Sequence, residues 1–158
     1  MTTAEADAKF ESHLFGMREE REQGLKRTIL YLDDDAACLQ IFMELIGGHF
    51  EVRTAQTLSE ARALLAACPA EIVISDKLMP EIDGTKFLCE VAEKYPASCR
   101  MLLTGTVTLG NVIQQIGNGV VQFFLTKPWT EQEMRAVLER AEAYLDAPER
   151  TKRAFHGS

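Results

Sequence analysis

The chain contains 158 residues, of which 46% are hydrophobic and 26% charged, and its 24 acidic and 17 basic side chains give a formal net charge of −7. This length suits about one domain with its own apolar core, and the average composition excludes a fibrous or largely disordered protein. The negative charge argues against binding of nucleic acid or an anionic membrane by bulk attraction. It is compatible with a divalent cation or a basic partner.

Targeting signals and redox sites are not expected. The first residues mix acidic and basic side chains, unlike the basic start and apolar run of a signal peptide. The longest uncharged stretch, 101–126, is interrupted by glycine, asparagine and glutamine, so we do not expect it to span a membrane. The cysteines form no CxxC pair and have no nearby histidine; they are Cys38, Cys68, Cys89 and Cys99. We interpret them as reduced, small hydrophobic residues of a cytoplasmic protein.

Residues 1–27 are predicted to form a helical extension. Their composition favours a helix, and Phe10, Leu14 and Met17 form one narrow apolar stripe. Because so narrow a stripe cannot form a core alone, the helix packs on its own domain, pairs with a second copy, or joins a segment absent from this sequence. The sequence leaves these three alternatives open. Residues 147–158 are predicted to be a short basic tail.

Residues 28–146 alternate between β-rich runs and helical patterns, and we predict one domain over this range. The expected strands are Thr28–Leu32, Phe50–Thr54, Glu71–Ser75, Arg100–Thr104 and Gln122–Thr126. The expected helices are Ala36–Ile46, Leu58–Cys68, Thr85–Tyr95, Leu109–Ile116 and Glu131–Leu145. Capping boxes at Thr57 with Glu60 and at Thr130 with Glu133 support two of the helix starts. The alternation predicts parallel strands with helices on both faces of the sheet.

The apolar pattern of each strand predicts its place in the sheet. Four runs are continuously apolar, which is typical of strands buried on both faces; they are Ile29–Leu32, Ile72–Ile74, Met101–Leu103 and Phe123–Leu125. The run Phe50–Thr54 alternates apolar and polar residues, as an edge strand does. We therefore predict an α/β fold with a flavodoxin-like, doubly wound sheet of five parallel strands in the order 2-1-3-4-5, together with the extra N-terminal helix.

Polar side chains close four of the predicted strands. The run Asp33–Asp35 follows the first strand, and Asp76 follows the third. Thr104 ends the fourth strand, and Lys127 comes directly after the fifth. Ligands of doubly wound sheets bind outside the carboxyl ends of the strands. We therefore expect these carboxylates, this hydroxyl and this ammonium group to meet at one edge of the sheet.

Gathered carboxylates need a counter-charge, because two of them about 4 Å apart repel by roughly 4 kcal/mol at an effective dielectric constant of about 20. Lys127 supplies one positive charge, and oxygen ligands without histidine or cysteine favour Mg²⁺ over zinc. With such a cation in place, an aspartate can attack phosphorus while Lys127 and Thr104 position the phosphoryl oxygens. Asp35 is interpreted as a helix N-cap rather than as a ligand.

Four stretches carry a resemblance to a known family: ILYLDDD (29–35), IVISDKLMPEIDG (72–84), MLLTG (101–105) and FFLTKPW (123–129). Through them, the chain from Thr28 to Leu145 resembles a response-regulator receiver domain, the phosphoacceptor domain of two-component signalling. The KPW ending is similar to that of receivers fused to HD-type cyclic-dinucleotide phosphodiesterases and of hydrogenase regulators. The resemblance also implies that the Lys127–Pro128 peptide bond is cis.

The resemblance implies a Mg²⁺ site beside a phosphoacceptor. The resemblance implies that Asp76 accepts the phosphoryl group and also contributes to the metal site. Asp34 binds Mg²⁺ directly, whereas Asp33 acts through water. The backbone carbonyl of Leu78 completes the set of metal ligands. No other cofactor is implied.

The same resemblance implies which residues hold the phosphoryl group and which residues change conformation on phosphorylation. Thr104 and Lys127 would hold the phosphoryl group, and Thr104 with Phe124 would form the switch that alters partner binding. Phe124 lacks the hydroxyl of the commoner tyrosine, so a switch there would rest on packing alone. Trp129 is interpreted as a core residue rather than as a partner contact.

The resemblance further implies partners. A sensor histidine kinase or phosphotransfer protein would donate the phosphoryl group, and an unidentified downstream protein or fused output domain would respond. We expect no direct binding of nucleic acid or membrane, and no enzymatic activity beyond self-catalysed phosphotransfer and dephosphorylation. Homodimerisation through the N-terminal helix, or through the face formed by helix 4, strand 5 and helix 5 of the domain, stays open.

Two other functions compete with this interpretation. A haloacid-dehalogenase-type phosphatase would use Asp33 as its nucleophile, with Asp35 as the second aspartate of a DxD pattern. The positions downstream fit that family poorly, because Ala37 stands where it has threonine or valine. A degenerate receiver that acts only as a binding module is disfavoured because every motif position is present.

Overall fold

A computed structural model describes residues 26–105, 114 and 118–148 of the chain. Five parallel strands form one sheet in the order β2-β1-β3-β4-β5, which confirms the predicted topology. The strands are β1 (Thr28–Leu32), β2 (Glu51–Ala55), β3 (Ile72–Asp76), β4 (Cys99–Thr104) and β5 (Phe123–Thr126). The helices of the described residues are α2 (Ala36–Ile46), α3 (Leu58–Ala67), α4 (Gly84–Lys94) and α6 (Glu131–Asp146).

Three predicted segments fall largely outside the described residues: the N-terminal helix within 1–27, the helix Leu109–Ile116 and the tail 147–158. The domain boundaries drawn from the sequence therefore stay predictions. In the ranges that the structure describes, no helix combines the length and the apolar character needed to cross a membrane.

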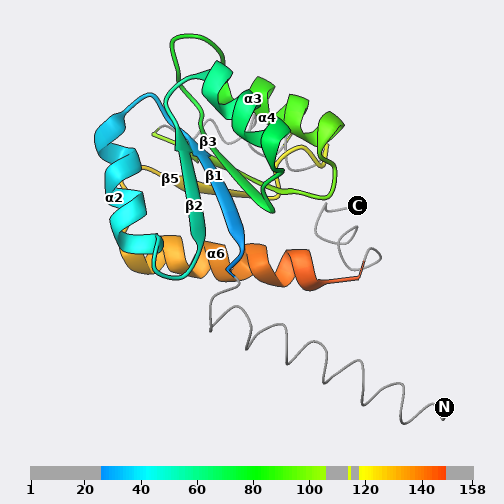
Figure 1. Ribbon diagram of the computed structural model, residues 1–158. Coiled ribbons are helices and arrows are strands. Elements are labelled where there is room, and N and C mark those ends of the chain that lie inside the picture. The colour runs from blue at the N-terminus through cyan, green and yellow to red at the C-terminus, as the bar shows by residue number, and fades with distance from the viewer. Residues whose placement is uncertain (1–25, 106–113, 115–117, 149–158) are drawn as a thin grey trace, which may run out of the picture.

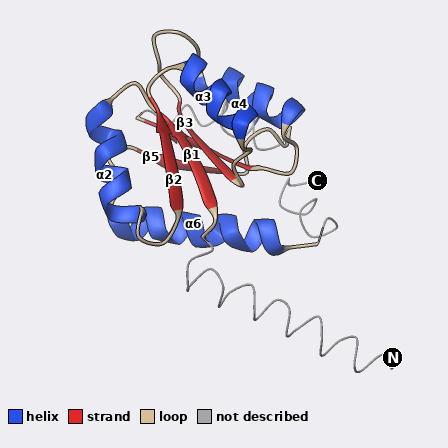
Figure 2. Cartoon of the chain, viewed as in Figure 1, coloured by secondary structure: helices blue, strands red, loops and turns tan. Residues whose placement is uncertain are grey.

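The helices form a layer on each face of the sheet, as Figures 1 and 2 show. Because side chains alternate along a strand, Ile29 and Tyr31 of β1 pack towards α2 and α6, whereas Leu30 and Leu32 pack towards α3 and α4. The buried apolar residues accordingly fall into two clusters, separated by the sheet. Both faces of β1, β3 and β4 are covered, which is why these strands read as continuous apolar runs.

The two edge strands differ from the central ones in burial. Strand β2 has exposed and half-buried residues, as its alternating pattern predicted. Strand β5 was expected to be buried on both faces, and this expectation is wrong, since Phe123–Thr126 are all half-buried. The reason is its place in the sheet: β5 pairs with β4 alone, so its apolar run is not enclosed as that of a central strand is.

Helix caps explain why several helices start where the sequence predicted. Asp35 accepts a hydrogen bond from the backbone N–H of Ala37 at 3.0 Å and is the N-cap of α2. Thr130 and Glu133 form the complete capping box at the start of α6. The capping box predicted at Thr57 is only half formed: Thr57 caps α3, but the Glu60 carboxylate accepts its hydrogen bond from the N–H of residue 56.

A buried arginine anchors the segment that leads into β5. Arg100 lies at the start of β4 and donates hydrogen bonds to the carbonyls of Gly119 (3.0 Å) and Val120 (2.6 Å). Its own backbone N–H donates to the side-chain carbonyl of Gln122 at 2.7 Å. These contacts fix the segment that precedes β5. Strand β5 then runs to the opposite end of the sheet, where Lys127 follows it.

The capping box of α6 gives a direct test of the fold. We expect Thr130→Ala to lower the free energy of unfolding by about 1 kcal/mol, because the N–H of Glu133 loses its acceptor. Urea unfolding followed by circular dichroism measures this loss. Thr130→Ser, which keeps the hydroxyl, should retain most of the stability, and equal losses in the two variants would contradict the assignment.

Candidate acidic site at the sheet edge

Three aspartates meet at the carboxyl ends of β1 and β3. Asp33, Asp34 and Asp76 each offer one carboxylate oxygen, and these oxygens lie within 4.8 Å of one another. Asp33 has no exposed surface, Asp76 is 9% exposed, and Asp34 faces solvent. The two strands are neighbours, with Leu32 paired to Ser75, so the residues that follow them are adjacent in space. The structure therefore places these three predicted residues together.

Lys127 is the cation that contacts this cluster. Its Nζ lies 2.7 Å from Oδ2 of Asp33 and 3.3 Å from Oδ1 of Asp76. Its backbone N–H donates to the carbonyl of Thr104 at 2.8 Å, which continues the pairing of β4 with β5. The Lys127–Pro128 peptide bond is cis, as the resemblance implied. The chain thus delivers one ammonium group to two of the three carboxylates.

The surroundings shift the pKa values of the two contacting groups. Burial, and then the negative charge of Asp33, raise the pKa of the Asp76 carboxyl above its ordinary value, against the opposing influence of Lys127. Burial alone would lower the pKa of Lys127, but its hydrogen bond to Asp33 and the charges of Asp33 and Asp76 outweigh this and raise it. Lys127 therefore stays cationic at neutral pH, and an additional cation would favour the ionised form of Asp76.

Asp33 is held by three hydrogen-bond donors. The hydroxyl of Tyr31 donates to Oδ2 at 2.7 Å, and Lys127 donates to the same oxygen. The backbone N–H of Asp35 donates to Oδ1 at 3.0 Å. Burial, followed by the hydrogen bond to Asp33, raises the pKa of Tyr31 above its ordinary value, so its hydroxyl stays a donor. A buried carboxylate is thereby fully supplied with partners.

Sequence reasoning missed Tyr31. The search for site residues started from the residues that end each strand, and Tyr31 lies inside β1. A signal was present in the spacing: residues two apart on a strand point to the same face, so a tyrosine two positions before an aspartate can reach its carboxylate.

A tight turn after β3 positions Asp76. The N–H of Gly84 donates to the carbonyl of Lys77 at 2.8 Å, and the N–H of Lys77 donates to Leu103 at 2.8 Å. A Cβ at residue 84 would lie 2.0 Å from the backbone oxygen of Asp76, so only glycine fits this approach. Asp83 caps α4 by accepting from the N–H of Thr85 at 2.8 Å.

The remaining predicted residues occupy different surroundings. Thr104 ends β4, is 2% exposed and lies opposite Thr126 in the register. Phe124 is half-buried and packs against the apolar cluster under α3 and α4. Leu78 exposes 67% of its surface, and its backbone forms an isolated bridge with Asp83. The structure brings Asp33, Asp34, Asp76 and Lys127 into one cluster, and the roles of Leu78, Thr104 and Phe124 stay predictions.

Cys38 and Trp129 flank the site. The Sγ atom of Cys38 is a free thiol that lies 4.0 Å from Nζ of Lys127 and 3.4 Å from a carboxylate oxygen of Asp35. Burial raises the pKa of its thiol, which keeps it protonated at neutral pH. Trp129 packs on the core as predicted, with its ring 6.2 Å from that of Phe42.

The donor set fits a hard divalent cation. The described residues gather three carboxylates here with no histidine or cysteine among the candidate ligands. Lys127 compensates one of the three charges, which leaves two formal negative charges for a cation to balance. Oxygen ligands of this kind suit Mg²⁺, which binds through few carboxylates and retains waters.

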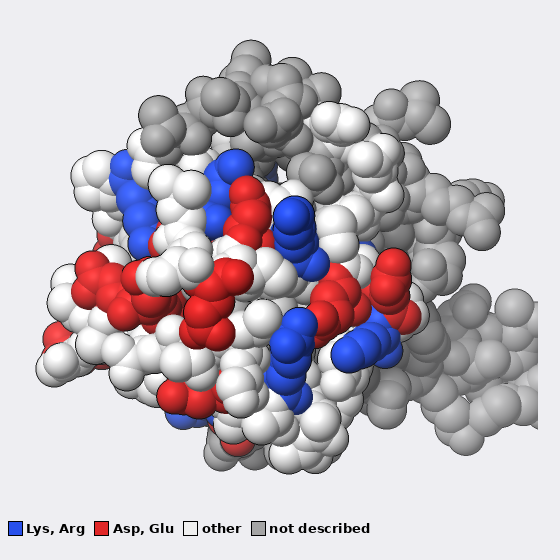
Figure 3. Space-filling view, turned by 90° about the horizontal axis from the view of Figure 1, so that it is seen from above, with Lys and Arg blue, Asp and Glu red and all other residues white. Residues whose placement is uncertain are grey.

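The surface around the sheet edge carries charges of both signs. Figure 3 looks down on the molecule from above and shows acidic side chains interspersed with lysine and arginine. On the described part of this face, the basic side chains do not gather into one continuous patch.

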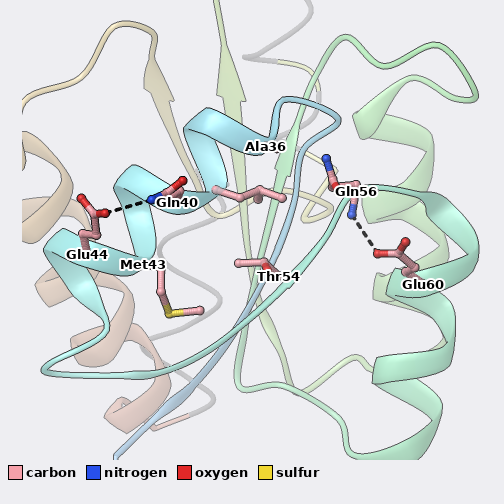
Figure 4. A pocket seen from close by; sticks show the side chains of 8 residues that line it. Ala36, Gln40, Met43, Glu44, Thr54, Gln56 and Glu60 are labelled. Carbon is pink, nitrogen blue, oxygen red and sulfur yellow. Dashed lines mark hydrogen bonds between the residues drawn. The ribbon is translucent and has the colours of Figure 1, made fainter.

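A shallow groove lies beside the site, between α2 and the loop that joins β2 to α3 (Figure 4). It has a volume of about 330 Å³ and is lined by Ala36, Leu39, Gln40, Met43, Glu44, Thr54, Gln56 and Glu60. At its rim, Gln40 donates to Glu44 at 3.2 Å, and the N–H of Gln56 donates to Glu60 at 3.1 Å. None of the three clustered aspartates lines it, so it is distinct from the acidic site.

Comparison with known proteins identifies relatives of most of this chain. The profile of the response regulator receiver domain matches residues 29–139. The hydrogenase transcriptional regulatory protein HoxA of Cupriavidus necator is 27% identical over 114 residues, covering 72% of this chain and 24% of HoxA. Response regulator Rre1 of Synechocystis is 32% identical over 129 residues, covering 76% of this chain and 55% of Rre1. The chain thus spans about a quarter of HoxA and about half of Rre1.

The fold is also shared with solved structures. The signal receiver domain of an HD domain-containing protein from Pseudomonas fluorescens superposes with a TM-score of 0.71 at 30% identity, covering 77% of this chain and 98% of that one. These relatives thus include a hydrogenase regulator and the receiver of an HD domain-containing protein.

The close approach at Gly84 generates a prediction for the site. Gly84→Ala should lower the free energy of unfolding by about 1–3 kcal/mol, since the added methyl group meets the backbone oxygen of Asp76. Urea unfolding measures the change. Gly48→Ala is the matched control, because a Cβ there meets nothing within 4 Å and should leave stability nearly unchanged. Equal effects at the two glycines would contradict the packing argument.

Proposed function

The chain belongs to the response regulator receiver domain family, and we propose that it accepts a phosphoryl group on Asp76 in a Mg²⁺-dependent reaction. The observation that carries the proposal is the cluster of three carboxylates within 4.8 Å, with the Lys127 ammonium 3.3 Å from Asp76. Receiver domains are signalling phosphoacceptors, and their donors are histidine kinases or phosphotransfer proteins. We propose the same class of donor here.

Asp76 is the carboxylate best suited to react. It is adjacent to the other two aspartates yet keeps some exposed surface, so a donor can reach it. In the proposed step, one oxygen of Asp76 attacks the phosphorus of a phosphohistidine. The new O–P bond forms as the P–N bond breaks, and the electron pair of that bond leaves with the histidine nitrogen.

Asp33, Asp34, Asp76 and the carbonyl of Leu78 are the groups that we propose to hold Mg²⁺. When bound, the ion supplies positive charge that offsets the repulsion between the carboxylates and the phosphoryl oxygens. The chain itself holds the acceptor in place, since Lys127 contacts the Asp76 carboxylate.

Lys127 and Thr104 are proposed to hold the transferred group. The Lys127 ammonium already lies 3.3 Å from Asp76, so a small movement away from Asp33 would bring it to a phosphoryl oxygen. Thr104 ends the adjacent strand β4 and has a hydroxyl that can donate to a second oxygen. A shift of Thr104 would change the packing of Phe124 on β5, and we propose that this change alters partner binding.

The partners are proposals too, because the chain spans only part of the relatives that it matches. HoxA is named a transcriptional regulatory protein, which favours an output domain, fused or separate, as the recipient of the signal. We propose that this domain itself binds neither nucleic acid nor membrane. The cytoplasmic location, the N-terminal helix and homodimerisation through either predicted face stay predictions.

The surroundings of Asp33 disfavour the phosphatase alternative. A nucleophile needs an oxygen that the substrate can reach, whereas Asp33 has no exposed surface. Its Oδ2 accepts from both Tyr31 and Lys127, and its Oδ1 accepts from a backbone N–H. Asp33 is therefore suited to anchor the site rather than to attack a substrate.

Intact-mass spectrometry tests the phosphoacceptor. After incubation with acetyl phosphate and Mg²⁺, the wild-type chain should gain one phosphoryl group, and Asp76→Asn should gain none. Asp35→Asn is the matched control: it alters an exposed aspartate two positions from Asp33 that caps α2 and lies outside the cluster, so labelling should persist. Labelling of Asp76→Asn would instead move the nucleophile to Asp33 and support the phosphatase.

The fluorescence of Trp129 should report ligand binding. Trp129 is the only tryptophan in the sequence and comes two residues after Lys127. Its ring contacts Phe42, which in turn contacts Tyr31 beside the cluster. We expect Mg²⁺ or the phosphoryl mimic beryllofluoride to change its emission, and Asp34→Asn to require more Mg²⁺ for the same change. An emission spectrum that is unaltered at saturating ligand would contradict this coupling.

A further inference from the structure

We propose that Tyr31 is a positioning residue for Asp33: its hydroxyl fixes the Asp33 carboxylate for Mg²⁺ and releases Lys127 to move to the phosphoryl group. This inference rests on the proposed function. It adds to it Tyr31, which lies inside β1 rather than at the end of a strand. It concerns how the site is held, and not which atom reacts.

The geometry of Tyr31 supports this role. Its side chain is fully buried in β1, and its hydroxyl lies 2.7 Å from Oδ2 of Asp33, the residue that follows the strand. The ring packs edge-on against Phe42 of α2 at a centroid distance of 4.9 Å. A strand backbone on one side and a buried aromatic ring on the other leave the hydroxyl little freedom, so the donor is preorganised.

Two donors share one oxygen of Asp33. This sharing suggests that Tyr31 keeps the carboxylate in place while Lys127 is free to move. Tyr31 and Lys127 both donate to Oδ2 at 2.7 Å. If Lys127 were the only side-chain donor, its departure towards a phosphoryl group would leave a buried carboxylate oxygen without a partner, which is costly. Because Tyr31 stays in place, Lys127 can leave Asp33 while Oδ2 keeps a hydrogen bond.

A neutral donor also leaves the charge of the site unchanged. Tyr31 adds no positive charge, so the two formal negative charges that remain after pairing with Lys127 are still present for a cation. A second lysine or an arginine at this position would orient Asp33 equally well but would compete with Mg²⁺. Hydrogen-bonded partners of metal ligands act in this way in metal sites generally, by fixing the orientation of the ligand.

The test compares two buried tyrosines of the same apolar cluster. Tyr31→Phe removes the hydroxyl that contacts Asp33, and Tyr144→Phe removes a hydroxyl from α6, where the ring packs on Phe123. Mg²⁺ affinity of the full chain is measured by calorimetry. The rate of phosphorylation by acetyl phosphate is measured separately at saturating Mg²⁺. Circular dichroism establishes the folded fraction, so that affinity and rate are expressed per folded molecule.

We expect Tyr31→Phe to weaken Mg²⁺ binding about ten-fold and to slow phosphorylation at saturating Mg²⁺, whereas Tyr144→Phe should match the wild type. A merely structural role would change the melting temperature but neither of these values. Tyr31→Phe values within two-fold of the wild type would overturn the inference. A wild-type chain that binds no Mg²⁺ and takes up no phosphoryl group would overturn the proposed function instead.

A second variant covers the case in which Tyr31→Phe does not fold. Phe42→Leu keeps the Tyr31 hydroxyl but removes the ring that restrains it. It should weaken Mg²⁺ binding in the same direction and by less. Unchanged Mg²⁺ affinity in this variant would count against Tyr31 as a positioning residue.

Discussion

Charge balance at the carboxyl edge of the sheet is the constraint on which the rest of this structure depends. Three carboxylates lie within 4.8 Å of one another, and Lys127, 94 residues from Asp33, is the side chain that compensates one of them. The parallel register places β1, β3 and β5 so that their following residues reach the same edge. The remaining negative charge makes this edge suited to a divalent cation, as the proposed function requires.

The two buried aspartates differ in a way that divides their tasks. Asp33 is inaccessible and receives donors on both oxygens, so it is rigid and unreactive. Asp76 keeps some exposure, and its raised pKa reflects burial and the charge of its neighbour. This difference supports the proposal that Asp33 positions the site and Asp76 reacts.

Local patterns predicted most of the fold because they depend on neighbours in the sequence. The helix Ala36–Ile46 was predicted with its bounds unchanged, since Asp35 caps it and Gly47 ends it. The errors arose where a distant contact decides the outcome. The burial of β5 depends on its having one strand neighbour. Tyr31 was missed because its partner is identified only once β1 is extended and buried.

The sequence by itself determined the order of strands and helices, the family, and the residue types that close each strand, because periodicity and motif spacing are local properties. Tertiary structure alone decided which of those groups touch. It paired Lys127 with Asp33 as well as with Asp76, and placed Cys38 beside the ammonium group. The physical reason is that distances between side chains far apart in the chain follow from strand register and helix packing, which no short stretch of sequence contains.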